Sequence, residues 1–122
     1  MGKKILIVDD SSMMRLVVKK AAAKEEYEVI EAADGKEGLE QLLKHNDISL
    51  ILSDINMPVM DGMEMVSKIK QNDALKYIPI VMLTTERSNE AKEEGKQLGV
   101  KAWMVKPFNE ATFIKAMKKL IG

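Results

Sequence analysis

The sequence predicts a three-layer α/β fold in which five parallel strands form one sheet with helices on both faces. Three observations carry this prediction. Short apolar runs alternate with helical patterns five times, each connection is long enough to hold a helix, and the central run, residues 48–52, is apolar. Parallel strands need such crossovers, and a strand buried on both faces reads as a continuous apolar run. Right-handed crossovers then place helices on both sides of the sheet.

The expected strands share one pattern, an apolar or alternating run followed at once by polar or turn-forming residues. Their residues are 4–8, 27–32, 48–52, 79–83 and 101–105. The central strand stops near Asp54, and a proline and an Asp-Gly pair follow shortly afterwards. Ligands bind at the carboxyl ends of strands in open α/β sheets, so Asp54 lies where chemistry is expected. The alternative is a strand-end aspartate that caps the next helix.

Apolar residues at helical spacing predict a helix after each strand. The expected helices cover residues 13–24, 36–44, 63–71 and 89–98, with a final one from a cap at Asn109 to residue 121. Ser11 or Ser12 is expected to cap the first helix. The apolar residues expected on one face of the second helix are Leu39, Leu42 and Leu43.

Composition excludes several classes of function. The 122 residues make one ordinary domain, which we expect to span 1–122. Basic and acidic residues both total 19, so no net positive charge favours nucleic acid. No run resembles a membrane span or a signal peptide, so a cytoplasmic protein that binds no membrane is expected. We also expect a monomer. The chain has no cysteine and one histidine, His45, which excludes thiol catalysis and Cys- or His-rich metal sites.

Side chains capable of chemistry follow four of the predicted strands. They are Asp9, Asp10, Asp54, Thr84 and Lys106. If the strands are parallel, all of them lie at one edge of the sheet. Clustered carboxylates repel each other by roughly 4 kcal/mol per pair at ~4 Å, and a divalent cation would offset that repulsion. Oxygen ligands with open coordination positions suit Mg²⁺, with Mn²⁺ as a substitute.

Carboxylates, Mg²⁺, a hydroxyl and a lysine together form a site for phosphoryl transfer. No phosphate-binding loop of the GxxxxGK type is present, so nucleotide binding is not supported, and no cofactor other than the metal is expected. A carboxylate can itself be the nucleophile and become an aspartyl phosphate. The residues therefore predict an acceptor of a phosphoryl group.

At these motifs the sequence resembles the receiver domain of two-component response regulators. The matching segments are residues 5–10, 52–58, 60–62, 81–86 and 103–108, with sequences ILIVDD, LSDINMP, MDG, VMLTTE and WMVKPF. The resemblance implies the flavodoxin-like and CheY-like strand order 2-1-3-4-5. It also implies a cis peptide between Lys106 and Pro107.

The resemblance assigns a role to each site residue. Asp54 would be phosphorylated, and Thr84 and Lys106 would bind the phosphoryl oxygens as catalytic groups. Asp9, Asp10 and Asp54 would hold Mg²⁺ together with the backbone carbonyl of Asn56. Such a domain catalyses only its own phosphorylation and dephosphorylation, and is not an enzyme for other substrates.

The resemblance also implies a switch made by Thr84 and Trp103. Phosphorylation would draw Thr84 inward and let Trp103 move, which changes the surface of the fourth helix, fifth strand and fifth helix. The alternative is that Trp103 is an ordinary edge-strand hydrophobe. Thr85, Glu86 and the segment 103–108 resemble single-domain chemotaxis regulators, and the sequence ends one helix after that segment. Both observations favour a stand-alone chemotaxis messenger.

The expected partners are a sensor histidine kinase as donor and a target such as a flagellar motor switch protein. A receiver domain of another two-component pathway is one alternative. A small Mg²⁺-dependent phosphatase with an aspartyl-phosphate intermediate is another, disfavoured because Asn56 stands where its second aspartate would be. A flavodoxin-type electron carrier is disfavoured by the clustered carboxylates.

Overall fold

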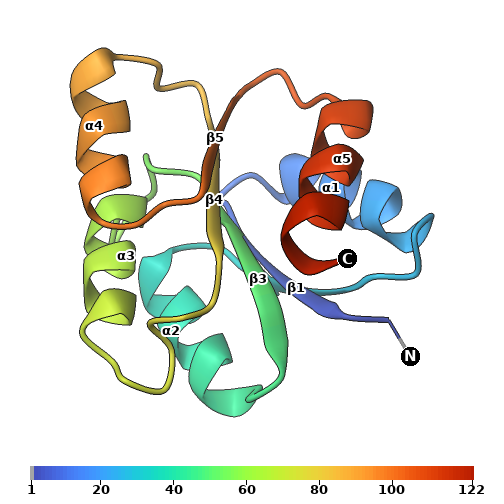
Figure 1. Ribbon diagram of the computed structural model, residues 1–122, viewed down its shortest axis with the longest axis horizontal. Coiled ribbons are helices and arrows are strands. Elements are labelled where there is room, and N and C mark those ends of the chain that lie inside the picture. Colours follow the sequence, from blue (N-terminus) through green and yellow to red (C-terminus); the bar gives the residue numbers. More distant parts are fainter. Residues whose placement is uncertain (1) are drawn as a thin grey trace.

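The computed structural model describes residues 2–122 and contains one parallel sheet of five strands (Figure 1). The strands are β1 (Lys4–Val8), β2 (Glu28–Ala32), β3 (Ile48–Ser53), β4 (Ile80–Thr84) and β5 (Ala102–Val105). Their order in the sheet is β2-β1-β3-β4-β5, and every neighbouring pair is parallel. This confirms the predicted α/β class and strand order.

The helices form a layer on each face of this sheet. They are α1 (Ser12–Ala23), α2 (Gly35–Lys44), α3 (Gly62–Lys70), α4 (Asn89–Gln97) and α5 (Glu110–Ile121). Helices α1 and α5 cover one face, and α2, α3 and α4 cover the other (Figure 1). Within residues 2–122, no helix is long and apolar enough to cross a membrane.

Each helix begins at a side chain that accepts a hydrogen bond from an amide of its first turn. The capping residues are Ser11, Asp34, Asp61, Ser88 and Asn109. Such caps satisfy amides that have no partner inside the helix, and so they fix where the helix starts. The predicted caps at Ser11 and Asn109 are confirmed.

The core consists of two apolar clusters separated by the sheet. Along β1, Leu6 and Val8 point into the cluster under α2 and α3, while Ile5 and Ile7 point into the cluster under α1 and α5. This alternation is the ordinary geometry of a strand. The central strand is buried on both sides, as its apolar run predicted, and only Ser49 within it is partly exposed.

One predicted inward position is wrong. Leu43 of α2 is 74% exposed, although Leu42 beside it is 2% exposed. Successive residues of a helix are rotated by about 100° around its axis, so Leu43 lies outside the narrow stripe that faces the sheet.

Candidate functional site

The carboxyl edge of the sheet brings the predicted acidic residues together. Asp9 follows β1 directly and Asp54 follows β3, and the register places Val8 beside Ser53. The amide of Asp54 donates to the carbonyl of Val8 at 2.9 Å, so the two strand ends stay joined at this point. One carboxylate oxygen each from Asp9, Asp10 and Asp54 lies within 4.8 Å of the other two. The predicted convergence of these carboxylates is therefore present in the structure.

Lys106 joins two of these carboxylates. Its Nζ donates to Oδ2 of Asp54 at 2.8 Å and to Oδ2 of Asp9 at 2.9 Å. Asp54 is 8% exposed and Asp9 is 1% exposed, so both negative charges are largely removed from water. Burial lowers the pKa of Lys106, but its hydrogen bonds to Asp54 and Asp9 outweigh burial, and its pKa is raised above the ordinary 10.5. Lys106 is therefore a cation at neutral pH.

Asp54 is held closely by the chain around it. Its Oδ1 accepts a hydrogen bond of 2.6 Å from the amide of Ile55. The amide of Gly62 donates to the carbonyl of Ile55 at 2.8 Å, and a Cβ at Gly62 would overlap the backbone oxygen of Asp54. Only glycine therefore lets α3 begin directly against the end of β3, a requirement that the sequence shows only as the Asp-Gly pair.

The donor set suits Mg²⁺, because it consists of carboxylate oxygens at an edge that is partly open. Asp9 is oriented by the amide of Ser11, which donates to its Oδ1 at 2.9 Å, whereas Asp10 is exposed. Asn56 lies two residues after Asp54 in the loop that follows β3, and it is exposed. A ligand role for its backbone carbonyl stays a prediction.

Thr84 and Trp103 are linked through the backbone of Glu86. The buried hydroxyl of Thr84 accepts from the amide of Glu86 at 3.2 Å, and the indole N–H of Trp103 donates to the carbonyl of Glu86 at 2.9 Å. Thr84 stands at the same sheet edge as the carboxylates, at the end of β4. The contribution of Glu86 was not predicted, because backbone groups leave no signal in a side-chain pattern.

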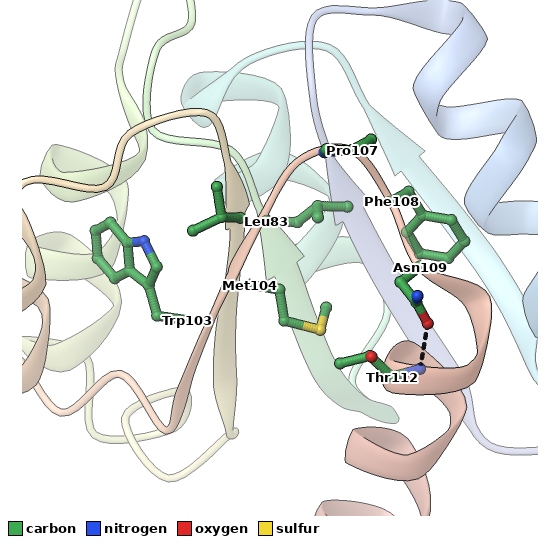
Figure 2. Close-up of a pocket in the computed structure, with 8 residues that line it drawn as sticks. Leu83, Trp103, Met104, Pro107, Phe108, Asn109 and Thr112 are labelled. Atoms are coloured by element: carbon green, nitrogen blue, oxygen red, sulfur yellow. Dashed lines mark hydrogen bonds between the residues drawn. The ribbon is translucent and has the colours of Figure 1, made fainter.

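A cavity of about 220 Å³ lies beside β5, next to this site (Figure 2). Its lining residues are Leu83, Trp103, Met104, Val105, Pro107, Phe108, Asn109 and Thr112. Figure 2 shows the Trp103 indole on one side of β5 and the Met104 side chain on the other. The peptide between Lys106 and Pro107 is cis, as predicted.

Comparisons with known proteins agree with this geometry. Residues 5–118 match the response regulator receiver domain family. The chain is 36% identical to chemotaxis protein CheY1 of Helicobacter pylori over 120 residues, which is 98% of this chain and 97% of that protein. It is 40% identical over 98 residues to histidine kinase P4 of Formosa agariphila, covering 80% of this chain but only 7% of that protein.

A solved structure extends the similarity to three dimensions. Chemotaxis protein CheY4 of Vibrio cholerae superimposes with a TM-score of 0.92 at 43% identity, covering 99% of this chain and 100% of that one. The chain therefore belongs to the response regulator receiver domain family of two-component systems.

Proposed function

We propose that Asp54 accepts a phosphoryl group from the phosphohistidine of a sensor histidine kinase. The observation that carries this proposal is the Lys106 ammonium group bound to both Asp9 and Asp54 within the carboxylate cluster. A lysine bound to both Asp9 and Asp54 can stay bound to Asp9 while it moves from Asp54 to a phosphoryl oxygen, so positive charge remains next to the reacting group.

In the proposed reaction an oxygen of Asp54 attacks the phosphorus atom. A P–O bond forms, the P–N bond to the donor imidazole breaks, and the electron pair returns to nitrogen, which takes a proton from water. Lys106 transfers its hydrogen bond from Asp54 to a phosphoryl oxygen, and the Thr84 hydroxyl donates to another. Mg²⁺, held by Asp9, Asp10, Asp54 and the carbonyl of Asn56, would neutralise phosphoryl charge when bound.

The same groups would assist hydrolysis of the aspartyl phosphate by water. The domain then catalyses its own modification and its own reset, and turns over no separate substrate. This use of the site needs no nucleotide pocket, since the ATP is consumed by the kinase.

The link through Glu86 supplies the route from phosphorylation to a surface change. When the Thr84 hydroxyl turns toward a phosphoryl oxygen, it leaves the amide of Glu86, and the loop that holds Trp103 is released. The Trp103 side chain of β5 lies against Gly95 of α4, so its movement alters the face formed by α4, β5 and α5. A bistable element biased by a local charge has this form.

We further propose that this face binds a flagellar motor switch protein in chemotaxis. The similarity to CheY1 over nearly the full length of both chains supports this pathway, whereas the similarity to a kinase supports other two-component roles. We also propose that the protein is a monomer and that it works in the cytoplasm, where the kinase and its ATP are located. A pull-down with a motor switch protein, with and without beryllofluoride, separates these pathways. Binding only of the beryllofluoride form supports chemotaxis, and absence of binding argues for another target.

The phosphoacceptor is tested by labelling with acetyl phosphate and Mg²⁺. Intact mass should show one added phosphoryl group on the wild type and none on Asp54→Asn. The matched control is Asp61→Asn, a second aspartate of the same loop that is exposed and caps α3. It should label like the wild type, because asparagine also caps helices. Equal labelling of Asp54→Asn and wild type would refute the assignment.

A further inference from the structure

Arg15 of α1 contacts the backbone that carries the two adjacent aspartates. Its guanidinium donates from Nη1 to the carbonyl oxygen of Asp9 at 2.6 Å, and from Nε to Oε1 of Glu31 at 3.0 Å. The Arg15 side chain is 18% exposed and Glu31 belongs to β2. One arginine therefore ties α1 and β2 to the loop between β1 and α1.

These contacts fix the peptide plane between Asp9 and Asp10. The amide of Asp9 donates to the carbonyl of Ala32 at 3.0 Å, which joins Asp9 directly to the end of β2. The carbonyl of Asp9 is joined to β2 indirectly, through Arg15 and Glu31. A peptide unit is planar, so holding the carbonyl of Asp9 also sets the amide and Cα of Asp10. Asp10 is exposed, and the direction of its side chain depends on that backbone.

Arginine is suited to this task because its planar guanidinium donates in two fixed directions at once. Lys19 provides a comparison within the same helix. Its Nζ lies 3.8 Å from Glu31, but its side chain is 56% exposed and, within residues 2–122, it makes only this ion pair. Lys19 therefore carries the same charge near the site without the contact to Asp9.

We propose that Arg15, oriented by Glu31, is a positioning residue that aims Asp10 at the cation of the acceptor site. The inference rests on the proposed Mg²⁺-dependent function of Asp54. Groups that orient a metal ligand typically change metal affinity by about 10- to 100-fold when they are removed. The two possible roles of Arg15 predict opposite changes in Mg²⁺ affinity when its side chain is removed. Loss of a positioning group should weaken Mg²⁺ binding, whereas loss of a nearby positive charge alone should strengthen it.

The test is calorimetric titration of the unphosphorylated protein with MgCl₂, which measures binding without any reaction. Arg15→Met should weaken Mg²⁺ binding about tenfold. Arg15→Lys keeps the charge but loses the two-directional contact, so it should also bind Mg²⁺ several-fold more weakly. Lys19→Met is the matched control and should bind Mg²⁺ as tightly as the wild type or slightly more tightly.

A readout without metal accompanies the titration. The amide of Ser11 is bonded to Asp9, and its hydrogen exchange should quicken in Arg15→Met before Mg²⁺ is added. If Arg15→Met does not fold, Arg15→Lys carries the same test. If the wild type binds Mg²⁺ and both Arg15 variants bind it equally well or more tightly, the positioning role of Arg15 is wrong but the proposed function still stands. Failure of the wild type to bind Mg²⁺ would overturn the proposed function as well.

Discussion

At the scale of single residues, the site is organised by one cation between two buried anions. Two carboxylates about 4 Å apart repel each other by roughly 4 kcal/mol at the dielectric of a partly buried site. Lys106 bonds both Asp9 and Asp54, and this interaction offsets much of that repulsion. The same ammonium group therefore stabilises the unmodified site and, under the proposed function, would bind the phosphoryl group.

Lys106→Met should lower the free energy of unfolding by about 1–3 kcal/mol at pH 7, less than for a fully buried pair because 15% of the Lys106 side chain is exposed. The pKa of Lys106 is raised on folding, so its stabilisation is complete below the unfolded value of 10.5 and is lost as pH rises through the higher folded value. The difference between variant and wild type should therefore stay constant from pH 7 to 10 and shrink above that range. Urea denaturation at each pH measures it.

Lys118→Met is the matched control for this prediction. Lys118 pairs with Glu25 at 2.9 Å, but its side chain is 59% exposed, and solvent screens the pair. The control should lose much less stability than Lys106→Met. If both variants lost the same unfolding free energy, Lys106 would not offset the repulsion between Asp9 and Asp54.

At the scale of elements, α4 and β5 meet at a glycine and an indole. A Cβ at Gly95 of α4 would lie 2.9 Å from Cζ3 of Trp103, so the helix leaves room for the ring only because position 95 lacks a side chain. The indole N–H of Trp103 also donates a hydrogen bond to the backbone carbonyl of Glu86, in the loop before α4. Trp103 is thus located by α4 on one side and by the loop before α4 on the other.

Gly95→Ala should displace the Trp103 ring and shift its fluorescence emission. Alanine in a helix interior normally stabilises by about 1 kcal/mol relative to glycine, but here the overlap with the ring should cancel most of that gain. The control Lys92→Ala changes an exposed position of α4 and should leave the emission unchanged. Since Trp103 is the only tryptophan in the sequence, the signal is unambiguous. An unaltered emission in Gly95→Ala would contradict the contact.

The elements and the carboxylate cluster were predictable because both follow from local patterns. Parallel strands place their carboxyl ends at one edge, so Asp9, Asp54 and Lys106 had to approach each other once the strands were recognised. Arg15 and Glu86 were not predictable, since Arg15 contacts the backbone carbonyl of Asp9 and Glu86 acts through its own backbone amide and carbonyl. Apolar character alone also did not determine that Leu43 faces solvent.

At the scale of the whole molecule, one sheet is shared by the two cores. Each of the central strands contributes alternate side chains to both clusters, as Ile51 and Leu52 of β3 do. Trp103 packs against the cluster under α2 and α3, whereas Met117 of α5 is fully buried in the cluster on the opposite face. Loss of packing on one face should therefore be felt on the other through the shared strands.

Met117→Ala should destabilise the protein by about 2–5 kcal/mol, because it leaves a cavity in a close-packed core. If the sheet couples both faces, unfolding by urea should remain a single transition. The midpoint followed by Trp103 fluorescence should then move with the midpoint followed by far-UV circular dichroism, although Trp103 lies on the other face. The exposed position Lys115 of α5 provides the control, since Lys115→Ala should change stability by no more than about 0.5 kcal/mol. A Trp103 midpoint that stayed in place while the dichroism midpoint fell would show that the two faces unfold separately.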